Sequence, residues 1–191
     1  MSDAHSSSDP AEPAWVTAVL KFWFDELDES HWFAKNDGID AQIRSRFLSL
    51  HRQLVADSGR VGRETPRALL AAVIVLDQFS RNLFRGTPEA FAADSIARSL
   101  SRSAIRRGAD AALTVPQRLF LYMPFEHSED REDQAYAVEL ISRLDNDEWT
   151  RYAVAHQAII DRFGRFPHRN PILDRASSAD EVALLQQPPD W

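Results

Sequence analysis

Apolar side chains recur with the period of an α-helix along almost the whole chain, and this pattern restricts the fold more than any other feature. One stripe at positions i, i+4, i+7 and i+8 comprises Trp15, Val19, Phe22 and Trp23, and a second comprises Ile39, Ile43, Phe47, Leu50 and Leu54. No stretch alternates apolar and polar residues for long enough to predict a β-strand. The sequence therefore predicts an all-α fold of about eight helices.

Start signals divide this pattern into separate helices. Thr65 followed by Pro66 supplies an N-cap and a proline at the first helical position, and the helix that it opens is expected to reach about Ser80. Because that helix is apolar on more than one face, we expect it at the centre of the fold. Further starts are expected at Thr87–Pro88, at Thr114 with Gln117, at Ser128, near Asp147 and at Ser178 with Glu181. The short connections favour antiparallel neighbours, so we expect stacked helical hairpins.

Length and composition favour one domain with a large core. The chain has 191 residues, of which 44% are hydrophobic, with five Trp and eleven Phe. Residues Met1–Pro13 are rich in Ser, Pro and acidic residues and lack the basic and apolar parts of a signal peptide, so we expect a disordered tail. Residues 14–191 are then expected to form a single all-α domain.

Composition also excludes several classes of function. A net charge of −7 argues against nucleic acid binding, and zero cysteines exclude disulfides, thiolate catalysis and Cys-based metal sites. The longest uncharged apolar run in the middle of the chain, Ala68–Leu76, is too short for a membrane span, which needs about 20 residues. We therefore expect a cytoplasmic protein with no nucleic acid or membrane partner.

The segment Arg162–Asn170, which we call the cationic corner, gathers three arginines, a histidine and an asparagine around Gly164 and Pro167. Guanidinium groups are costly to hold together unless an anionic group lies between them, and Gly and Pro fix backbone turns. We expect the corner to hold a negative group through Arg165, His168, Arg169 and Asn170. The sequence leaves open whether that group belongs to a ligand or to the chain's own acidic segment, residues 124–133.

Two further polar segments lie at the ends of apolar helices. Asp77 and Arg81 are four residues apart and can pair at a helix end, next to Asn82; the pair either only closes the helix or contributes to a site. Glu126 and His127 follow the apolar run Leu119–Phe125, so we expect them to point inward. There, a carboxylate and an imidazole can transfer protons or bind a metal.

His156 lies on the apolar stripe of the helix expected from Asp147 to Phe163, and we expect a hydrogen-bonded core histidine there. The chain has no H-E-x-x-H pattern, no histidines four residues apart on a helix, no phosphate-binding loop and no dinucleotide fingerprint. The sequence therefore predicts neither a metal nor a cofactor. The aromatic residues of Phe22–Phe24 and Trp32–Phe33 are predicted to be core rather than a stacking surface.

Several of these segments together resemble a bacterial family known as domain of unknown function 924. The resemblance covers nearly the whole chain after the tail, and its landmarks are residues 19–24, Trp32–Phe33, residues 76–82, Phe91–Asp94, residues 124–130 and residues 162–170. The resemblance implies helical hairpins stacked into a right-handed array similar to that of tetratricopeptide proteins. It implies no activity, substrate or cofactor. The chain departs from the family pattern at Asp174, where members commonly have Gly, and before Thr65, where it lacks a Trp.

Three functional hypotheses follow. The leading one is a pocket at the helix ends that binds a small anionic molecule or a peptide through Asp77, Arg81, Asn82, Glu126, His127, His156, Arg165, His168, Arg169 and Asn170. The second is an enzyme that uses His127 or His168 as acid or base, with an arginine stabilising developing negative charge. The third is a protein–protein scaffold, which requires a large exposed apolar patch.

Overall fold

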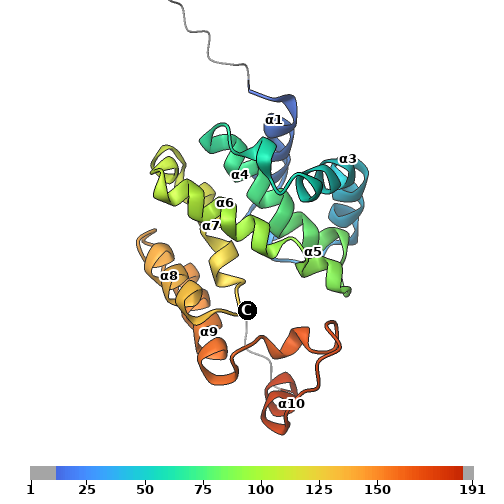
Figure 1. Ribbon diagram of the computed structural model, residues 1–191, viewed down its shortest axis with the longest axis vertical. Helices are drawn as coiled ribbons and strands as arrows, with labels where there is room; N and C mark the ends of the chain where they lie inside the picture. Colours follow the sequence, from blue (N-terminus) through green and yellow to red (C-terminus); the bar gives the residue numbers. More distant parts are fainter. Residues whose placement is uncertain (1–11, 187–191) are drawn as a thin grey trace, which may run out of the picture.

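The chain is helical throughout the part that the computed structural model describes, residues 12–186, and no strand occurs within these residues (Figure 1). The α-helices are α1 (Ala14–Lys21), α2 (Glu29–Trp32), α3 (Asp37–Ala56), α4 (Pro66–Ile74), α5 (Ser80–Leu83), α6 (Asp94–Arg106), α7 (Val115–Glu126), α8 (Arg131–Ser142), α9 (Asp147–Phe163) and α10 (Ala179–Gln186). Turns of π-helix span Phe22–Glu26 and Val75–Phe79, and turns of 3-10 helix span Arg60–Gly62, Pro88–Phe91, Ala109–Ala112 and Pro167–Arg169. The all-α prediction is confirmed.

Helix α4 lies at the centre of the main hydrophobic core, as its sequence predicts. Every residue from Ala68 to Ile74 is buried, because α1, α6 and α7 all pack against this helix. The helix continues through the π-helical turn into α5, and α3 packs on that continuation. Helix α4 is apolar on all its faces because other helices cover it on several sides.

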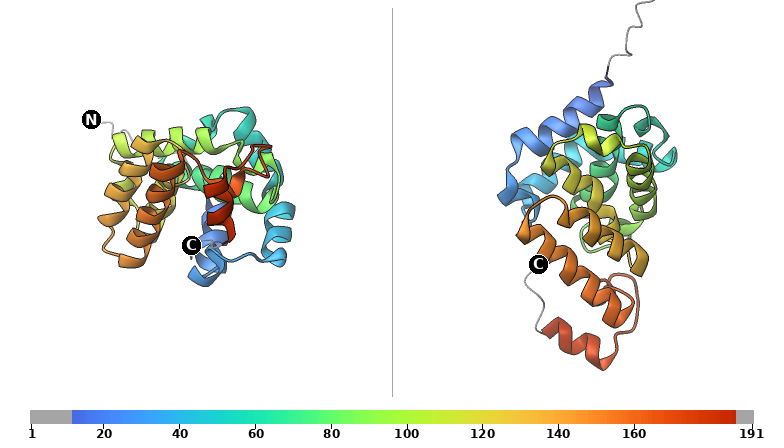
Figure 2. Two further views of the ribbon diagram at one scale, coloured as in Figure 1. Left: turned by 90° about the horizontal axis from the view of Figure 1, so that it is seen from below. Right: turned by 90° about the vertical axis from the view of Figure 1, so that its left-hand side faces the viewer.

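The later helices pack on one another in chain order. Helix α8 packs on α7, and α9 packs on α8, as stacked hairpins would. Helix α10 packs on the turn Pro167–Arg169, and a second, small apolar cluster forms there around Ile159, Ile160 and Phe166. Two views show α1 and α10 at opposite ends of the molecule (Figures 1 and 2). The arrangement is compatible with a tetratricopeptide-like array.

Most of the helix starts agree with the sequence. Thr65 caps α4, accepting a hydrogen bond from the Ala68 backbone N–H. The capping box of Thr114 and Gln117 opens α7, and Ser178 and Glu181 exchange the two hydrogen bonds of a second box at α10. These starts were predictable because a cap depends on residues within one turn.

Two starts differ from the prediction. Thr87–Pro88 opens only the 3-10 turn Pro88–Phe91, since the Thr87 hydroxyl donates to the Phe84 carbonyl, and α6 begins later, at Asp94. The N-cap of α8 is Asp130 rather than Ser128, whose hydroxyl donates instead to Asp133. The Thr87 hydroxyl points back to the preceding turn, and the Ser128 hydroxyl accepts from the backbone N–H of Asp130, one residue before α8, so neither hydroxyl caps the predicted start.

The sequence predicts a disordered tail for residues 1–13. Residues 1–11 of this segment lie outside the described part of the chain. Within residues 12–186, no helix combines the length and the apolar character that crossing a bilayer requires.

Gly62→Ala is expected to destabilise the protein by about 1–3 kcal/mol through overpacking. A Cβ at position 62 would lie 2.4 Å from the Cβ of Ala72 and 3.4 Å from the carbonyl oxygen of Ala68. Urea unfolding measures the loss. Ala72→Gly alone is expected to cost about 1 kcal/mol as a glycine inside a helix. In the double variant the clash is removed, so the loss should be clearly smaller than the sum; additive losses would contradict the packing explanation.

Candidate functional site

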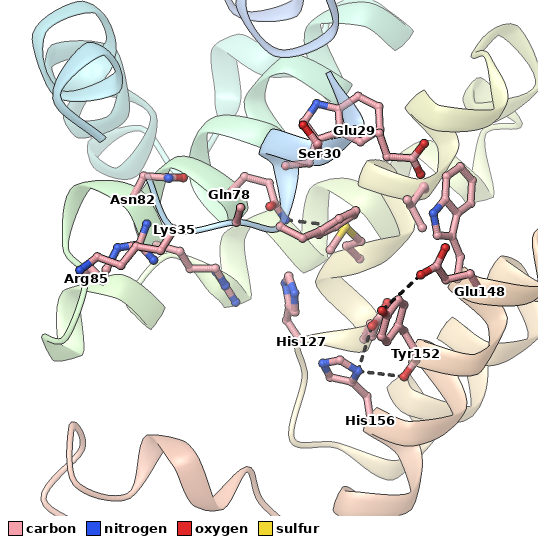
Figure 3. A pocket seen from close by; sticks show the side chains of 18 residues that line it. Glu29, Ser30, Lys35, Gln78, Asn82, Arg85, His127, Glu148, Tyr152 and His156 are labelled. Atoms are coloured by element: carbon pink, nitrogen blue, oxygen red, sulfur yellow. Dashed lines mark hydrogen bonds and ion pairs between the residues drawn. The ribbon is translucent and has the colours of Figure 1, made fainter. Parts of the chain in front are cut away.

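A pocket of about 620 Å³ opens between four parts of the chain. Its walls come from residues 29–35, residues 78–85, residues 119–127 and residues 148–156, which belong to α2 and its following loop, α5, α7 and α9 (Figure 3). This volume lies within the range of roughly 300–1,000 Å³ that small-molecule sites occupy. Apolar side chains, among them Leu119, Met123 and Trp149, line the pocket together with charged ones.

The π-helical turn Val75–Phe79 places a fully buried carboxylate beneath the wall of the pocket. Such turns occur frequently at functional sites because the widened helix redirects its side chains. Asp77 Oδ1 lies 2.8 Å from His127 Nδ1, and Oδ2 accepts a hydrogen bond of 2.6 Å from Gln78. Arg81, one turn later, lies 3.4 Å from Oδ1 and donates to the Asp77 carbonyl oxygen. Asp77 therefore holds three side chains that face the pocket.

The Asp77–His127 pair orients the imidazole. Burial by itself would raise the pKa of Asp77, but the charges of Arg81 and His127 and the hydrogen bonds to the carboxylate hold it at about 2. Burial lowers the pKa of His127, against the opposing effect of Asp77, so the ring is neutral at pH 7. Since an ionised carboxylate only accepts hydrogen bonds, the proton resides on Nδ1 and the lone pair on Nε2. This is the tautomer that a general base requires.

Glu126 and His156 form a second pair in the same wall. His156 Nδ1 lies 3.0 Å from Glu126 Oε1 and 2.9 Å from the carbonyl oxygen of Tyr152. Burial, followed by the charge of Asp77, raises the pKa of Glu126 to about 8, and burial lowers that of His156 to about 3. Both groups are therefore neutral at pH 7, and the contact is a hydrogen bond rather than an ion pair. Glu126 presents a protonated carboxyl group next to a basic His127.

Two arginines support the Asp77–His127 pair. Arg81 binds Asp94 with both terminal nitrogens, at 3.0 and 3.2 Å. Arg169 donates a hydrogen bond of 3.0 Å to the backbone carbonyl of His127. The Arg169 guanidinium lies between two aromatic rings, 4.6 Å from the centroid of Phe91 and 4.5 Å from that of Phe166. These contacts fix the backbone that carries His127.

The structure brings together most of the site residues expected from the sequence. Arg81, Asn82, Glu126, His127 and His156 line the pocket, and Asp77 lies directly beneath it. Arg169 reaches this group through the backbone of His127, and it also lines a shallower hollow on the other side of that histidine.

The rest of the cationic corner does not line the pocket. Arg165 binds Glu181 through two nitrogens, at 2.7 and 2.8 Å, and Asn170 is fully buried and donates to Ser177. His168 is exposed, with its ring centroid 5.6 Å from that of Phe166. The reason is Gly164, whose positive φ of 68° ends α9 and turns the chain toward α10. A ligand-binding role for these three residues has no support from their positions.

The alternative left open by the sequence, docking of this region onto the acidic segment, does occur. Glu129 accepts a hydrogen bond of 2.8 Å from the Phe166 backbone N–H and binds Arg175 through both carboxylate oxygens. The negative groups that contact the cationic corner are thus the chain's own carboxylates, Glu129 and Glu181.

Sequence reasoning missed the aromatic and charged residues at the two ends of the pocket. Trp32 and Phe33 both line the pocket. The prediction that Phe33 is a core residue is wrong, because this side chain is 57% exposed. Lys35, Arg85, Glu29 and Glu148 also line the pocket. The available signal was an aromatic pair set between polar residues in a short segment, which is typical of a surface rather than a core. Asp94 appeared only as a landmark of the family resemblance.

Among residues 12–186, no group of three or more His, Asp or Glu side chains is arranged to hold a metal ion.

Comparisons with known proteins agree with the family resemblance that the sequence motifs indicate. No curated protein matches the chain. A solved structure of a protein of unknown function from Agrobacterium tumefaciens is 36% identical, and the match covers 91% of this chain and 98% of that one with a TM-score of 0.87. The model of a family of bacterial proteins of unknown function (DUF924) matches residues 19–189. The chain therefore belongs to the DUF924 family.

Proposed function

We propose that the chain binds a small molecule that carries an anionic group, in the pocket between α2, α5, α7 and α9. The observation that carries this proposal is the composition of one pocket of about 620 Å³, in which Lys35, Arg81 and Arg85 lie beside an apolar wall. Pockets for small ligands combine a mainly apolar surface with a few convergent polar groups. Guanidinium and ammonium groups supply the hydrogen bonds that fix a carboxylate or phosphate.

The cations differ in how firmly they are already held. Arg81 is bound to Asp94 and Asp77 on its inner side, and Arg85 is bound to Asp40. Lys35 is paired only weakly with Asp37, at 3.6 Å and with both side chains mostly exposed. Exposed pairs of this kind contribute little free energy, so a ligand can replace Asp37 at small cost. Lys35 is therefore the side chain expected to move onto the ligand.

Thermal-shift measurements with a panel of carboxylates, phosphates and other metabolites test the proposal, because a ligand of the folded state stabilises by RT ln(1 + [L]/Kd). Ala34→Trp places a bulky side chain in the lining of the pocket at an exposed position, and Ala112→Trp is the matched control on an exposed 3-10 turn elsewhere. A compound that stabilises the wild type and Ala112→Trp, but not Ala34→Trp, supports the proposal. A compound that stabilises Ala34→Trp as much as the wild type contradicts the proposal.

Acid–base catalysis is a second candidate, favoured by the Asp77–His127 pair. With the lone pair on Nε2, His127 can accept a proton from a bound molecule while the neutral carboxyl of Glu126 supplies one. His168 is exposed and lies outside the pocket lining, so this candidate assigns the role to His127. For a compound found in the panel, His127→Gln is expected to stop conversion, followed by NMR of the compound, while binding persists. An unchanged compound after incubation with wild type excludes this candidate.

No comparable observation favours a scaffold. The exposed large apolar side chains of the described residues are Phe33, Val55, Val115, Val154 and Val182, and they belong to four different helices and the loop after α2.

A further inference from the structure

Side chains of opposite charge line opposite ends of the pocket. In Figure 3, Lys35, Asn82 and Arg85 lie at one end, Glu29 and Glu148 lie at the other, and His127 lies between them. Residues 29–35 contribute Glu29 to the negative end and Lys35 to the positive end, whereas Asn82 and Arg85 follow the π-helical turn and Glu148 belongs to α9. A pocket that recognised only an anion would have no need of the two carboxylates.

The positive end is prepared by a carboxylate outside the pocket lining. Asp40 accepts hydrogen bonds from Asn82, at 2.7 Å, and from two nitrogens of Arg85, at 3.0 and 2.9 Å. Asp40 thereby fixes both donors and compensates one positive charge. The charge of Lys35 remains, because its contact with Asp37 is long and solvated. An anionic group bound here meets fixed donors and one mobile ammonium group.

The negative end combines carboxylates with aromatic surface. Glu148 accepts a hydrogen bond of 3.4 Å from the Tyr152 hydroxyl, and its ion pair with Arg151 is long, at 3.9 Å, and exposed. Trp149, which lines the same pocket, directly follows Glu148 in the chain. Ammonium groups bind at sites where a carboxylate lies beside the face of an aromatic ring, because ring quadrupole and charge act in the same direction.

We propose that this pocket selects a dipolar molecule, whose carboxylate is held at the Lys35–Arg85 end and whose ammonium group is held at the Glu29–Glu148 end. The inference rests on the proposed function and narrows its ligand class to compounds such as short peptides with free ends. A ligand that spans both ends passes His127 at its middle.

Isothermal titration calorimetry with alanine oligomers of two to five residues tests the inference on the full chain. Because both charged groups must reach fixed ends at once, affinity is expected to peak at one length rather than to rise steadily. At that length, N-acetylation and C-amidation are each expected to weaken binding at least about tenfold, since each leaves one set of polar groups unpaired. Equal affinity of blocked and free peptides, or no binding by any oligomer, overturns the inference.

Two variants assign the ends. Glu148→Gln is expected to weaken the free peptide but not the N-acetylated one, and Arg85→Gln is expected to weaken the free peptide but not the C-amidated one. The matched controls are Glu139→Gln and Arg143→Gln, which alter an exposed ion pair outside the pocket lining and should leave all affinities unchanged. Loss in the controls as well as the test variants counts against the assignment.

Failure of the inference is distinguishable from failure of the proposed function. If the N-acetylated peptide binds as tightly as the free one, and Ala34→Trp abolishes both, the pocket binds anions without recognising an ammonium group. If Ala34→Trp changes the binding of neither peptides nor panel compounds, the pocket is not the binding site and both proposals fail.

Discussion

Asp77→Ala is expected to lower the free energy of unfolding by about 3–5 kcal/mol, the cost of breaking a buried ion pair by removing one partner. Asp77 is completely buried and contacts His127, Gln78 and Arg81 through its side chain. Alanine leaves those polar groups facing a cavity, and Arg81 keeps its charge with one carboxylate fewer. Since stabilities of natural domains are roughly 5–15 kcal/mol, the loss is a large part of the total.

Urea unfolding at pH 7 measures this loss, and Asp37→Ala is its matched control. Asp37 is mostly exposed and forms only the long contact with Lys35, so its removal should change the stability by less than about 0.5 kcal/mol. The difference between wild type and Asp77→Ala should also shrink in acid. The pKa of Asp77 is lowered from 3.8 to about 2, so its contribution is present above pH 4 and is lost as the pH falls toward 2. Equal effects of the two variants would contradict a structural role for Asp77.

The helical class was predictable because it depends on local pattern, and its exceptions are informative. The apolar stripes of α1 and α3 and the cap of α4 are set by residues within a few turns. The π-helical turn Val75–Phe79 was not predictable, because its residues are buried on every side and give no face from which to read a period. That turn is what directs Asp77 toward His127, although they are 50 residues apart in the chain.

The candidate site was predictable in part for the same reason. Asp77, Arg81, Glu126 and His127 stand out as polar residues at the ends of apolar helices, and the structure brings those ends together. Most of the cationic corner lies outside the pocket lining because its partners are distant in the sequence: Arg165 binds Glu181, and the local sequence does not specify that choice. For Phe33 the local signal was only its polar neighbours, which indicate an exposed side chain without specifying which pocket it lines.

Glu126→Gln is expected to make the protein less sensitive to alkaline conditions. The pKa of Glu126 is raised from 4.5 to about 8 in the folded chain, so between these values the folded state keeps a proton that the unfolded state releases. Stability contributed by this group is full below pH 4.5 and is lost as the pH rises to 8, by on the order of 5 kcal/mol in total. Glutamine keeps an oxygen that can accept from His156 and cannot ionise, so the variant should match wild type near pH 4.5 and exceed it at pH 8.

The measurement is the free energy of unfolding in urea at intervals from pH 4.5 to 9, for wild type, Glu126→Gln and the exposed control Glu139→Gln. Only Glu126→Gln should flatten the decline with pH, because Glu139 is solvated and more than half exposed. An identical slope in wild type and Glu126→Gln would mean that Glu126 is ionised in the fold and that its contact with His156 is an ion pair. The charge of Asp77 also raises the pKa of Glu126, so Asp77→Asn should lower that pKa. The decline in stability should then end at a lower pH and amount to a smaller total loss. Such a change would show that the two carboxyl groups of the wild type titrate as a coupled pair, in which Asp77 orients the base His127 and Glu126 is the acid.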